Sequence, residues 1–126
     1  MNSDQLIENT TLMHKDHRNW LSQLNFYQDE IKFFQNELAS VIQSHMGSLS
    51  IIESVDEYKG IFLKKLEKID DLRHAIASHE SSMAASYVDS EAFRKQHQEI
   101  RKRLLAFVEE FEMLKKNFKR FAAHND

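Results

Sequence analysis

Residues 93–121 read FRKQHQEIRKRLLAFVEEFEMLKKNFKRF, and this stretch decides the fold. Its apolar residues recur at alternating intervals of three and four positions, with charged residues between them. One row consists of Phe93, Ile100, Phe107, Leu114 and Phe121, and a second consists of His97, Leu104, Phe111 and Phe118. A seven-residue repeat kept over four heptads is typical of a long amphipathic helix whose seam packs against other helices.

The same repeat occurs twice upstream. The first segment carries Leu6, Met13, Trp20, Tyr27, Phe34 and Val41, with a partner row of Thr10, His17, Leu24, Ile31, Leu38 and His45. The second carries Val55, Phe62, Ile69, Ile76 and Met83. The sequence therefore predicts an all-α fold: an elongated, antiparallel, up-down-up three-helix bundle with coiled-coil-like heptad packing, forming one domain over residues 1–126.

Two breaks separate the three predicted helices, which we place at about 4–45, 51–86 and 90–122. In the first break, Gly47 suits the left-handed position that follows a helix end. Ser50 and Glu53 then have the spacing of a capping box. In the second break, Asp89 or Ser90 can cap the third helix.

The composition excludes several classes of protein. Two glycines and no proline argue against a turn-rich β architecture. The absence of cysteine removes disulfides, thiolate nucleophiles, iron–sulfur clusters and cysteine-type zinc sites. No signal-like segment begins the chain, and no apolar run approaches the roughly 20 residues that span a bilayer. We therefore expect a cytoplasmic protein without a membrane partner.

The third segment is basic, with nine Lys or Arg against four Glu between Phe93 and Phe121. The chain as a whole has a formal net charge of -3, and Glu109, Glu110 and Glu112 interrupt the basic run. No DNA-reading motif accompanies it. We therefore expect the charge to complement two acidic neighbouring helices, and not to bind nucleic acid.

The histidines carry the functional signal, because three of them occupy seam positions on three different helices. With a first turn centred near Ser48, His17 lies opposite His79. With a second turn centred near Val88, His79 lies opposite His97. The sequence thus predicts that His17, His79 and His97 meet in one layer of the bundle, the histidine layer, with Glu80 and with His14 or Arg101 in the same shell.

Two interpretations of this layer stay open. In the first, it is a closed polar network that fixes helix register: Glu80 accepts from an imidazole, and Arg101 neutralises Glu80. In the second, it is a metal site for zinc or iron, with Glu80 as fourth ligand or in the outer shell. The paired Glu-x-x-His motifs of ferritin-like centres are not matched, since the nearest pattern, Asp71 to His74, occurs once.

The chain resembles a family of small, uncharacterised bacterial helical proteins. The residues that carry the resemblance are Trp20-Leu21-x-x-Leu24-x-Phe26-Tyr27-x-x-Glu30, Leu72-Arg73-His74, His79-Glu80, and His97 with Arg101 before the run from Phe107 to Phe121. The resemblance implies a helical bundle that keeps the histidine layer, and it supplies neither an activity nor catalytic residues.

No nucleophile with a base, no glycine-rich phosphate loop and no isolated pair of carboxylates occurs in the sequence. We therefore expect a non-enzymatic protein that acts by self-association, as a homodimer, or by binding a partner helix. The apolar residues beside the seams that would serve this contact are Leu21, Ile42, Leu66, Leu105 and Val108. The alternative is a metal-binding protein that uses the histidine layer.

Overall fold

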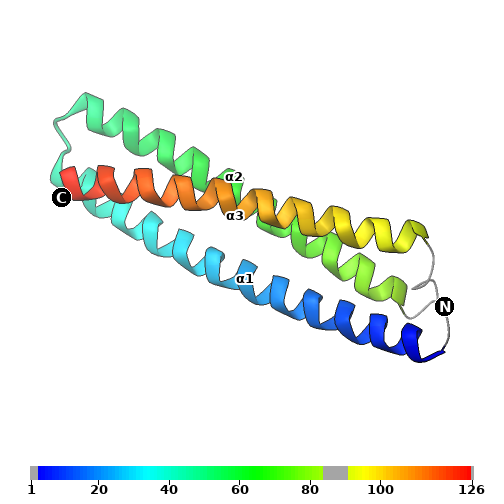
Figure 1. Cartoon of the computed structure of the whole chain (residues 1–126). Helices are drawn as coiled ribbons and strands as arrows, with labels where there is room; N and C mark the ends of the chain where they lie inside the picture. Colours follow the sequence, from blue (N-terminus) through cyan, green and yellow to red (C-terminus); the bar gives the residue numbers. More distant parts are fainter. Residues whose placement is uncertain (1–2, 84–90, 126) are drawn as a thin grey trace.

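The computed structural model describes residues 3–83 and 91–125, and these residues form three helices and no strand. Helix α1 spans Ser3–Ser44, α2 spans Leu49–Met83 and α3 spans Glu91–Asn125. The helices lie lengthwise beside one another, and the connection between α1 and α2 is at the same end as the C-terminus (Figure 1). The predicted all-α class is confirmed. At 1.5 Å per residue, α1 alone is about 63 Å long.

The turn between α1 and α2 differs from the prediction. Helix α2 begins at Leu49, so Ser48 stands immediately before it and its carbonyl accepts from the Ile52 N–H at 3.0 Å. Ser50 is therefore in the first turn and does not cap the helix. Gly47 does not adopt the left-handed conformation. The turn is closed instead by a bond from the Ser48 N–H to the His45 carbonyl at 3.0 Å, which needs no left-handed residue.

The other predicted boundaries deviate less. Helix α1 ends at Ser44, one residue before the predicted end. Helix α3 continues past the predicted residue 122 to Asn125, whose side-chain amide donates to the Phe121 carbonyl at 2.8 Å. The predicted end of the second helix at 86 and start of the third at 90, with Asp89 and Ser90 as caps, lie outside the described residues.

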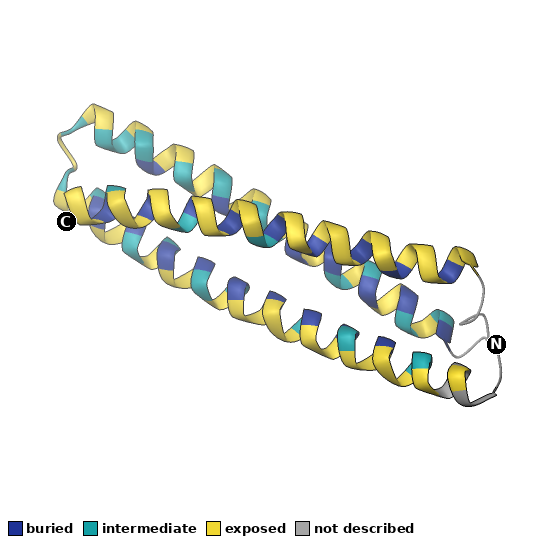
Figure 2. Cartoon of the chain, in the orientation of Figure 1, coloured by how far each residue is buried: buried dark blue, intermediate teal, exposed yellow. Residues whose placement is uncertain are grey.

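The core runs along the line where the three helices face one another (Figure 2). Its centre is aromatic: the Phe118 ring lies 5.0 Å from that of Phe34 and 5.2 Å from that of Phe62, measured between centroids. Phe62, Phe111 and Phe118 have no exposed surface. Burying a side chain of this size contributes about 1.5–3 kcal/mol, so the aromatic centre supplies much of the force that holds the helices together.

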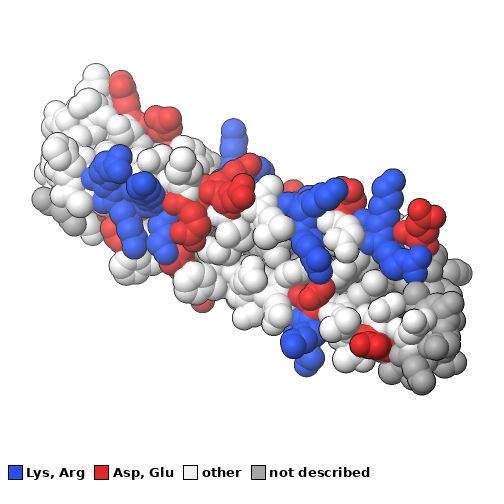
Figure 3. Space-filling view, viewed as in Figure 1, with Lys and Arg blue, Asp and Glu red and all other residues white. Residues whose placement is uncertain are grey.

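Ion pairs link the helices outside the core. Lys115 on α3 donates to Glu30 on α1 at 2.6 Å. Glu110 on α3 accepts from Lys65 at 2.7 Å and from Lys68 at 3.3 Å, both on α2. Basic side chains gather along the face of α3 in view, with acidic groups among them (Figure 3). Within the described ranges, no helix has the length and apolar character that crossing a membrane requires.

Candidate functional site

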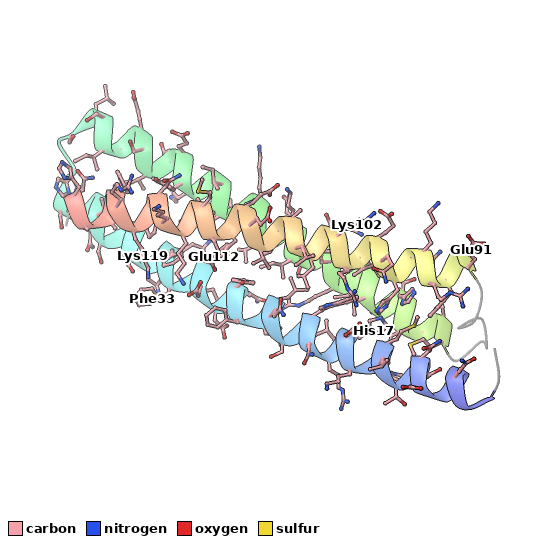
Figure 4. All side chains as sticks on the ribbon, viewed as in Figure 1. His17, Phe33, Glu91, Lys102, Glu112 and Lys119 are labelled. Carbon is pink, nitrogen blue, oxygen red and sulfur yellow. The ribbon has the colours of Figure 1, made fainter. Side chains whose placement is uncertain are left out.

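Three buried histidines, one from each helix, meet near the end of the bundle where α2 ends and α3 begins. His17, His79 and His97 are 2%, 3% and 3% exposed. Their ring centroids are 5.1–5.2 Å apart in all three pairs. One ring nitrogen from each lies within 4.8 Å of the other two. His17 occupies the side of α1 that faces the other helices (Figure 4). The predicted convergence of these three residues is confirmed.

Apolar side chains enclose the histidine layer along the bundle axis. One turn towards the start of α1, Met13, Met83 and Phe93 form a buried cluster of their own. On the other side, Trp20, Ile76 and Ile100 belong to the main core. The Phe93 ring stacks on His79 at 3.9 Å, and the Trp20 ring lies 4.7 Å from that of His97. The imidazoles therefore lie in a low-dielectric environment.

The hydrogen bonds of His79 determine which of its nitrogens carries a proton. Nε2 lies 3.0 Å from the backbone carbonyl of Phe93, which can only accept, so Nε2 carries a hydrogen. Nδ1 lies 3.1 Å from Nε2 of His17. In a neutral His79 this Nδ1 has a lone pair and accepts from the His17 N–H. Burial lowers the pKa of His79 and so favours the neutral ring. The hydrogen bond to the Phe93 carbonyl acts in the opposite direction but does not outweigh burial.

Glu80 extends this chain of contacts at the other end. One of its carboxylate oxygens contacts Nδ1 of His17, and the other contacts Nδ1 of His14. Burial raises the pKa of Glu80, but hydrogen bonds from His17 and His14 and their charges outweigh burial and hold the pKa below its usual value.

The row of contacts from the Phe93 carbonyl through His79 and His17 to Glu80 requires more hydrogens than two neutral rings supply. Both ends, the Phe93 carbonyl and the Glu80 carboxylate, are acceptors, so His79 and His17 together must carry three N–H groups. A neutral pair carries only two. These contacts therefore share one proton more than two neutral imidazoles supply, and a metal ion bound at the facing nitrogens of His17 and His79 would displace it.

His97 differs from the other two histidines. Its Nε2–H donates to Asp16 at 3.0 Å, and Arg101 donates to the same carboxylate oxygen at 3.0 Å. Its Nδ1 is buried and has no hydrogen-bond partner among the residues that the structure describes. Burial lowers the pKa of His97, although the Asp16 hydrogen bond opposes this effect. Nδ1 thus has a free lone pair inside the bundle.

Asp16, which accepts hydrogen bonds from His97 and Arg101, was not among the residues predicted for the layer. Arg101 was expected to neutralise Glu80, but it pairs with Asp16, because α3 presents Arg101 to α1 and not to α2. A signal was available: Asp16 precedes His17 directly, just as Glu80 follows His79. Glu80 contacts the outward nitrogen of His17, and His14 contacts Glu80, so both residues have the position expected of an outer shell.

The remaining histidines lie away from the layer. His45 follows the end of α1, and its Nδ1 contacts the Val41 carbonyl at 2.9 Å. His74 is exposed on α2, as is Asp71 at the start of the Asp71-to-His74 pattern. His124 is exposed near the end of α3. These residues serve as internal controls for any property assigned to the histidine layer.

A surface groove of about 540 Å³ between α2 and α3 reaches the edge of the layer. Small side chains leave this space open, and Ala75, Ser78 and Ser82 on α2 and Ala92 on α3 belong to its lining. His79 also lines it, while Lys95 and Arg103 place positive charge along it. The groove brings the surface of the molecule close to the histidine layer.

Comparison of the chain with protein-family models, with curated proteins and with solved structures finds no match. The function must therefore be argued from the geometry of the histidine layer itself.

Proposed function

We propose that the protein binds a transition-metal ion through His17, His79 and His97. The observation that carries this proposal is that the two nitrogens of each ring have different partners. One nitrogen of each imidazole is held at the outside by a fixed acceptor: Glu80 for His17, the Phe93 carbonyl for His79 and Asp16 for His97. One nitrogen of each ring lies within 4.8 Å of a nitrogen of each of the other two, and we assign this inner position to the second nitrogen of each ring.

Metal-binding histidines in proteins have this arrangement, in which a carboxylate or carbonyl accepts the N–H that does not face the metal. Such acceptors select the tautomer, orient the ring and make the ligating nitrogen more basic. Here all three rings have such an acceptor. Glu80 and Asp16 then act by orienting His17 and His97, while the carbonyl of Phe93 does the same for His79.

The distances suit a single ion. Two nitrogens bound to one tetrahedral zinc, each about 2.0–2.1 Å from the metal, lie roughly 3.3 Å apart. His17 Nε2 and His79 Nδ1 are already 3.1 Å apart. The third nitrogen lies within 4.8 Å of the others, so binding needs a small inward shift of one ring. Imidazole ligands suit zinc, copper, iron and nickel, and three of them leave a coordination position for a fourth ligand.

A purely structural polar layer accounts less well for His97. A closed network should satisfy every buried ring nitrogen, because an unsatisfied one costs on the order of 1–3 kcal/mol. Five of the six ring nitrogens in the layer have partners, but Nδ1 of His97 has none among the described residues. A metal ion at the centre of the layer supplies this missing partner.

We also propose that the three helices form an up-down-up bundle with heptad layers. In such a bundle, each helix contributes one residue to each layer, which is what brings three distant histidines together. The pairing of His17 with His79 and of Asp16 with Arg101 supports this arrangement.

Cobalt(II) titration of protein purified without an affinity tag tests the proposal. We expect one equivalent to give the visible absorption of a low-symmetry nitrogen-ligated ion and to quench Trp20, the chain's one tryptophan, which adjoins two of the rings. His97→Leu should lose both signals, and His74→Leu, on the exposed surface, should keep them. If the wild-type protein gives neither signal, or if His97→Leu responds equally, the proposal is wrong.

Self-association is a second candidate function, and the exposed apolar side chains favour it. Phe26 and Phe33 are 55% and 60% exposed on α1, one heptad apart, and they line a groove that Lys119 of α3 borders. Phe33 lies on the outer side of α1 (Figure 4). Of the five residues that the sequence suggested for this contact, Leu105 is strongly exposed and the other four are partly buried against the core.

Sedimentation equilibrium tests this second candidate. We expect the wild-type protein to form a dimer and the double substitution of Phe26 and Phe33 by serine to form a monomer, while Leu63→Ser on α2 stays dimeric. A wild-type protein that is monomeric at about 100 μM would exclude a stable homodimer, since interfaces of standard size give dissociation constants well below this concentration.

A further inference from the structure

The buried cluster next to the histidine layer contains two thioether sulfurs. Met13 and Met83 are each 8% exposed, and together with Phe93 they form a core cluster separate from the main one. We call these three residues the methionine layer. Buried methionine often serves only to fill space, so its position relative to the imidazoles decides whether it has a further role.

The methionine layer is about one helical turn from the histidine layer on all three helices. Met13 comes four residues before His17, Met83 four residues after His79, and Phe93 four residues before His97. Residues four apart lie one above the other on the same face of a helix. Since α2 runs opposite to α1 and α3, these offsets place both sulfurs on the same side of the three imidazoles.

A metal held by three imidazoles across the bundle has its fourth position along the bundle axis. On one side are Trp20, Ile76 and Ile100, which have no lone pair to donate to a metal. The nearby carboxylates, Glu80 and Asp16, are held by the outward nitrogens of His17 and His97. Among the residues described around the layer, the donors that remain are the sulfurs of Met13 and Met83.

We infer that the ion bound by the histidine layer is cuprous copper, with the thioether of Met13 or Met83 as its fourth ligand; this inference rests on the metal-binding function proposed above. Thioethers are soft ligands that select copper(I), whereas zinc and iron(II) gain little from them. Methionine has three rotatable side-chain bonds, so a sulfur from the adjacent layer can adjust to the ion. The apolar surroundings suit an ion of single charge better than a doubly charged one, because burying charge is costly.

Anaerobic competition with the copper(I) chelator bicinchoninate, in buffer without thiols, tests the inference. The variant carries both Met13→Leu and Met83→Leu, which conserve side-chain volume and leave the histidines in place. We expect it to bind copper(I) more weakly by on the order of tenfold or more, while its affinity for cobalt(II) changes little. The matched control carries Met46→Leu and Met113→Leu, which are 75% and 64% exposed, and should behave as wild type.

X-ray absorption of the copper-loaded wild-type protein gives an independent readout. We expect a copper–sulfur component, which only methionine can supply because the chain has no cysteine, and its loss in the double variant. If cobalt binds through the histidines but copper(I) affinity and the absorption spectrum are insensitive to Met13 and Met83, the inference is wrong and the proposed function stands. If no metal binds in a histidine-dependent way, the proposed function fails first.

Discussion

His97 donates its Nε2 hydrogen to Asp16 across the interface between α3 and α1 at 3.0 Å, and this contact leaves the opposite nitrogen of the ring as a buried lone pair. The carboxylate therefore fixes the tautomer of His97. It does so with help from Arg101, which donates to the same oxygen and holds the carboxylate in place. The buried lone pair on Nδ1 of His97 is therefore a consequence of the hydrogen bond that Asp16 accepts from Nε2.

Removal of the Asp16 carboxylate should weaken metal binding without removing a ligand. Asp16→Ala frees the His97 ring to rotate and to change tautomer, and losses of such outer partners cost roughly 10–100-fold in metal affinity. Cobalt(II) titration of the variant measures the effect. Asp29→Ala, at an exposed acidic position on the same helix, is the control and should bind as wild type. Equal affinity for all three proteins would mean that Asp16 does not orient a ligand.

The metal-free protein should become less stable as the pH falls below about 6.5. Burial lowers the pKa values of His79 and His97, so below that pH the unfolded chain binds protons that the folded chain does not. The free energy of unfolding therefore decreases as the pH falls towards the folded-state pKa values. The lowered pKa of Glu80 acts in the same direction, below the 4.5 of a free carboxyl.

Urea denaturation in the presence of a chelator, at about pH 7.5, 6 and 5, measures this dependence. The groups that face the two rings are His17, Glu80, Asp16 and Arg101, and all are retained in the wild-type protein. The double substitution of His79 and His97 by leucine should flatten the dependence between pH 7.5 and 5. Identical midpoints for the wild-type protein at all three pH values would show that the two imidazoles are not buried in neutral form.

Gly60→Ala should stabilise the protein. Gly60 lies within α2 and is exposed, and a Cβ at this position meets no atom within 4 Å. Alanine in a helix interior is favoured over glycine by roughly 0.5–1 kcal/mol, because it loses less backbone entropy on folding. The free energy of unfolding from urea denaturation should increase by about this amount. A decrease would show that the helix is irregular at this residue.

Lys115→Met should destabilise the protein through the carboxylate it leaves behind. Glu30 is 19% exposed and its Oε1 accepts from Lys115 at 2.6 Å, which raises the pKa of the lysine. The other oxygen of Glu30 is buried without a partner among the described residues. Loss of a hydrogen bond between charged groups costs about 1.5–3 kcal/mol. Lys116→Met, at an exposed position, should cost much less; equal effects of the two substitutions would contradict this explanation.

The sequence was sufficient to predict the helices and the histidine layer, and the reason is geometrical. Heptad position assigns a face to His17, His79 and His97. The predicted turns near Ser48 and Val88, the second of which lies outside the described residues, assign their heights to within a helical turn. An imidazole side chain is long enough to bridge a mismatch of this size between the predicted heights. The prediction for Gly47 failed because the turn is closed by backbone bonds through Ser48, for which no left-handed residue is needed.

The contacts around the histidine layer could not be predicted in the same way. Asp16 and Arg101 flank the seams, and whether Arg101 reaches Asp16 or Glu80 depends on the rotation of α3 about its axis. The Phe93 carbonyl accepts from His79 only because the start of α3 lies against the end of α2. Heptad periodicity specifies which side chains are buried, and it does not specify the hydrogen bonds that they form.

The most direct test of the account is the zinc content of the tag-free protein after equilibrium dialysis, measured by elemental analysis. Zinc accepts three imidazole ligands whatever the fourth ligand is, so this test does not depend on the role of the methionines. The account predicts one zinc ion per chain for the wild-type protein and for His74→Leu, and none for His97→Leu. A wild-type protein without zinc, or equal zinc in His97→Leu, would contradict it.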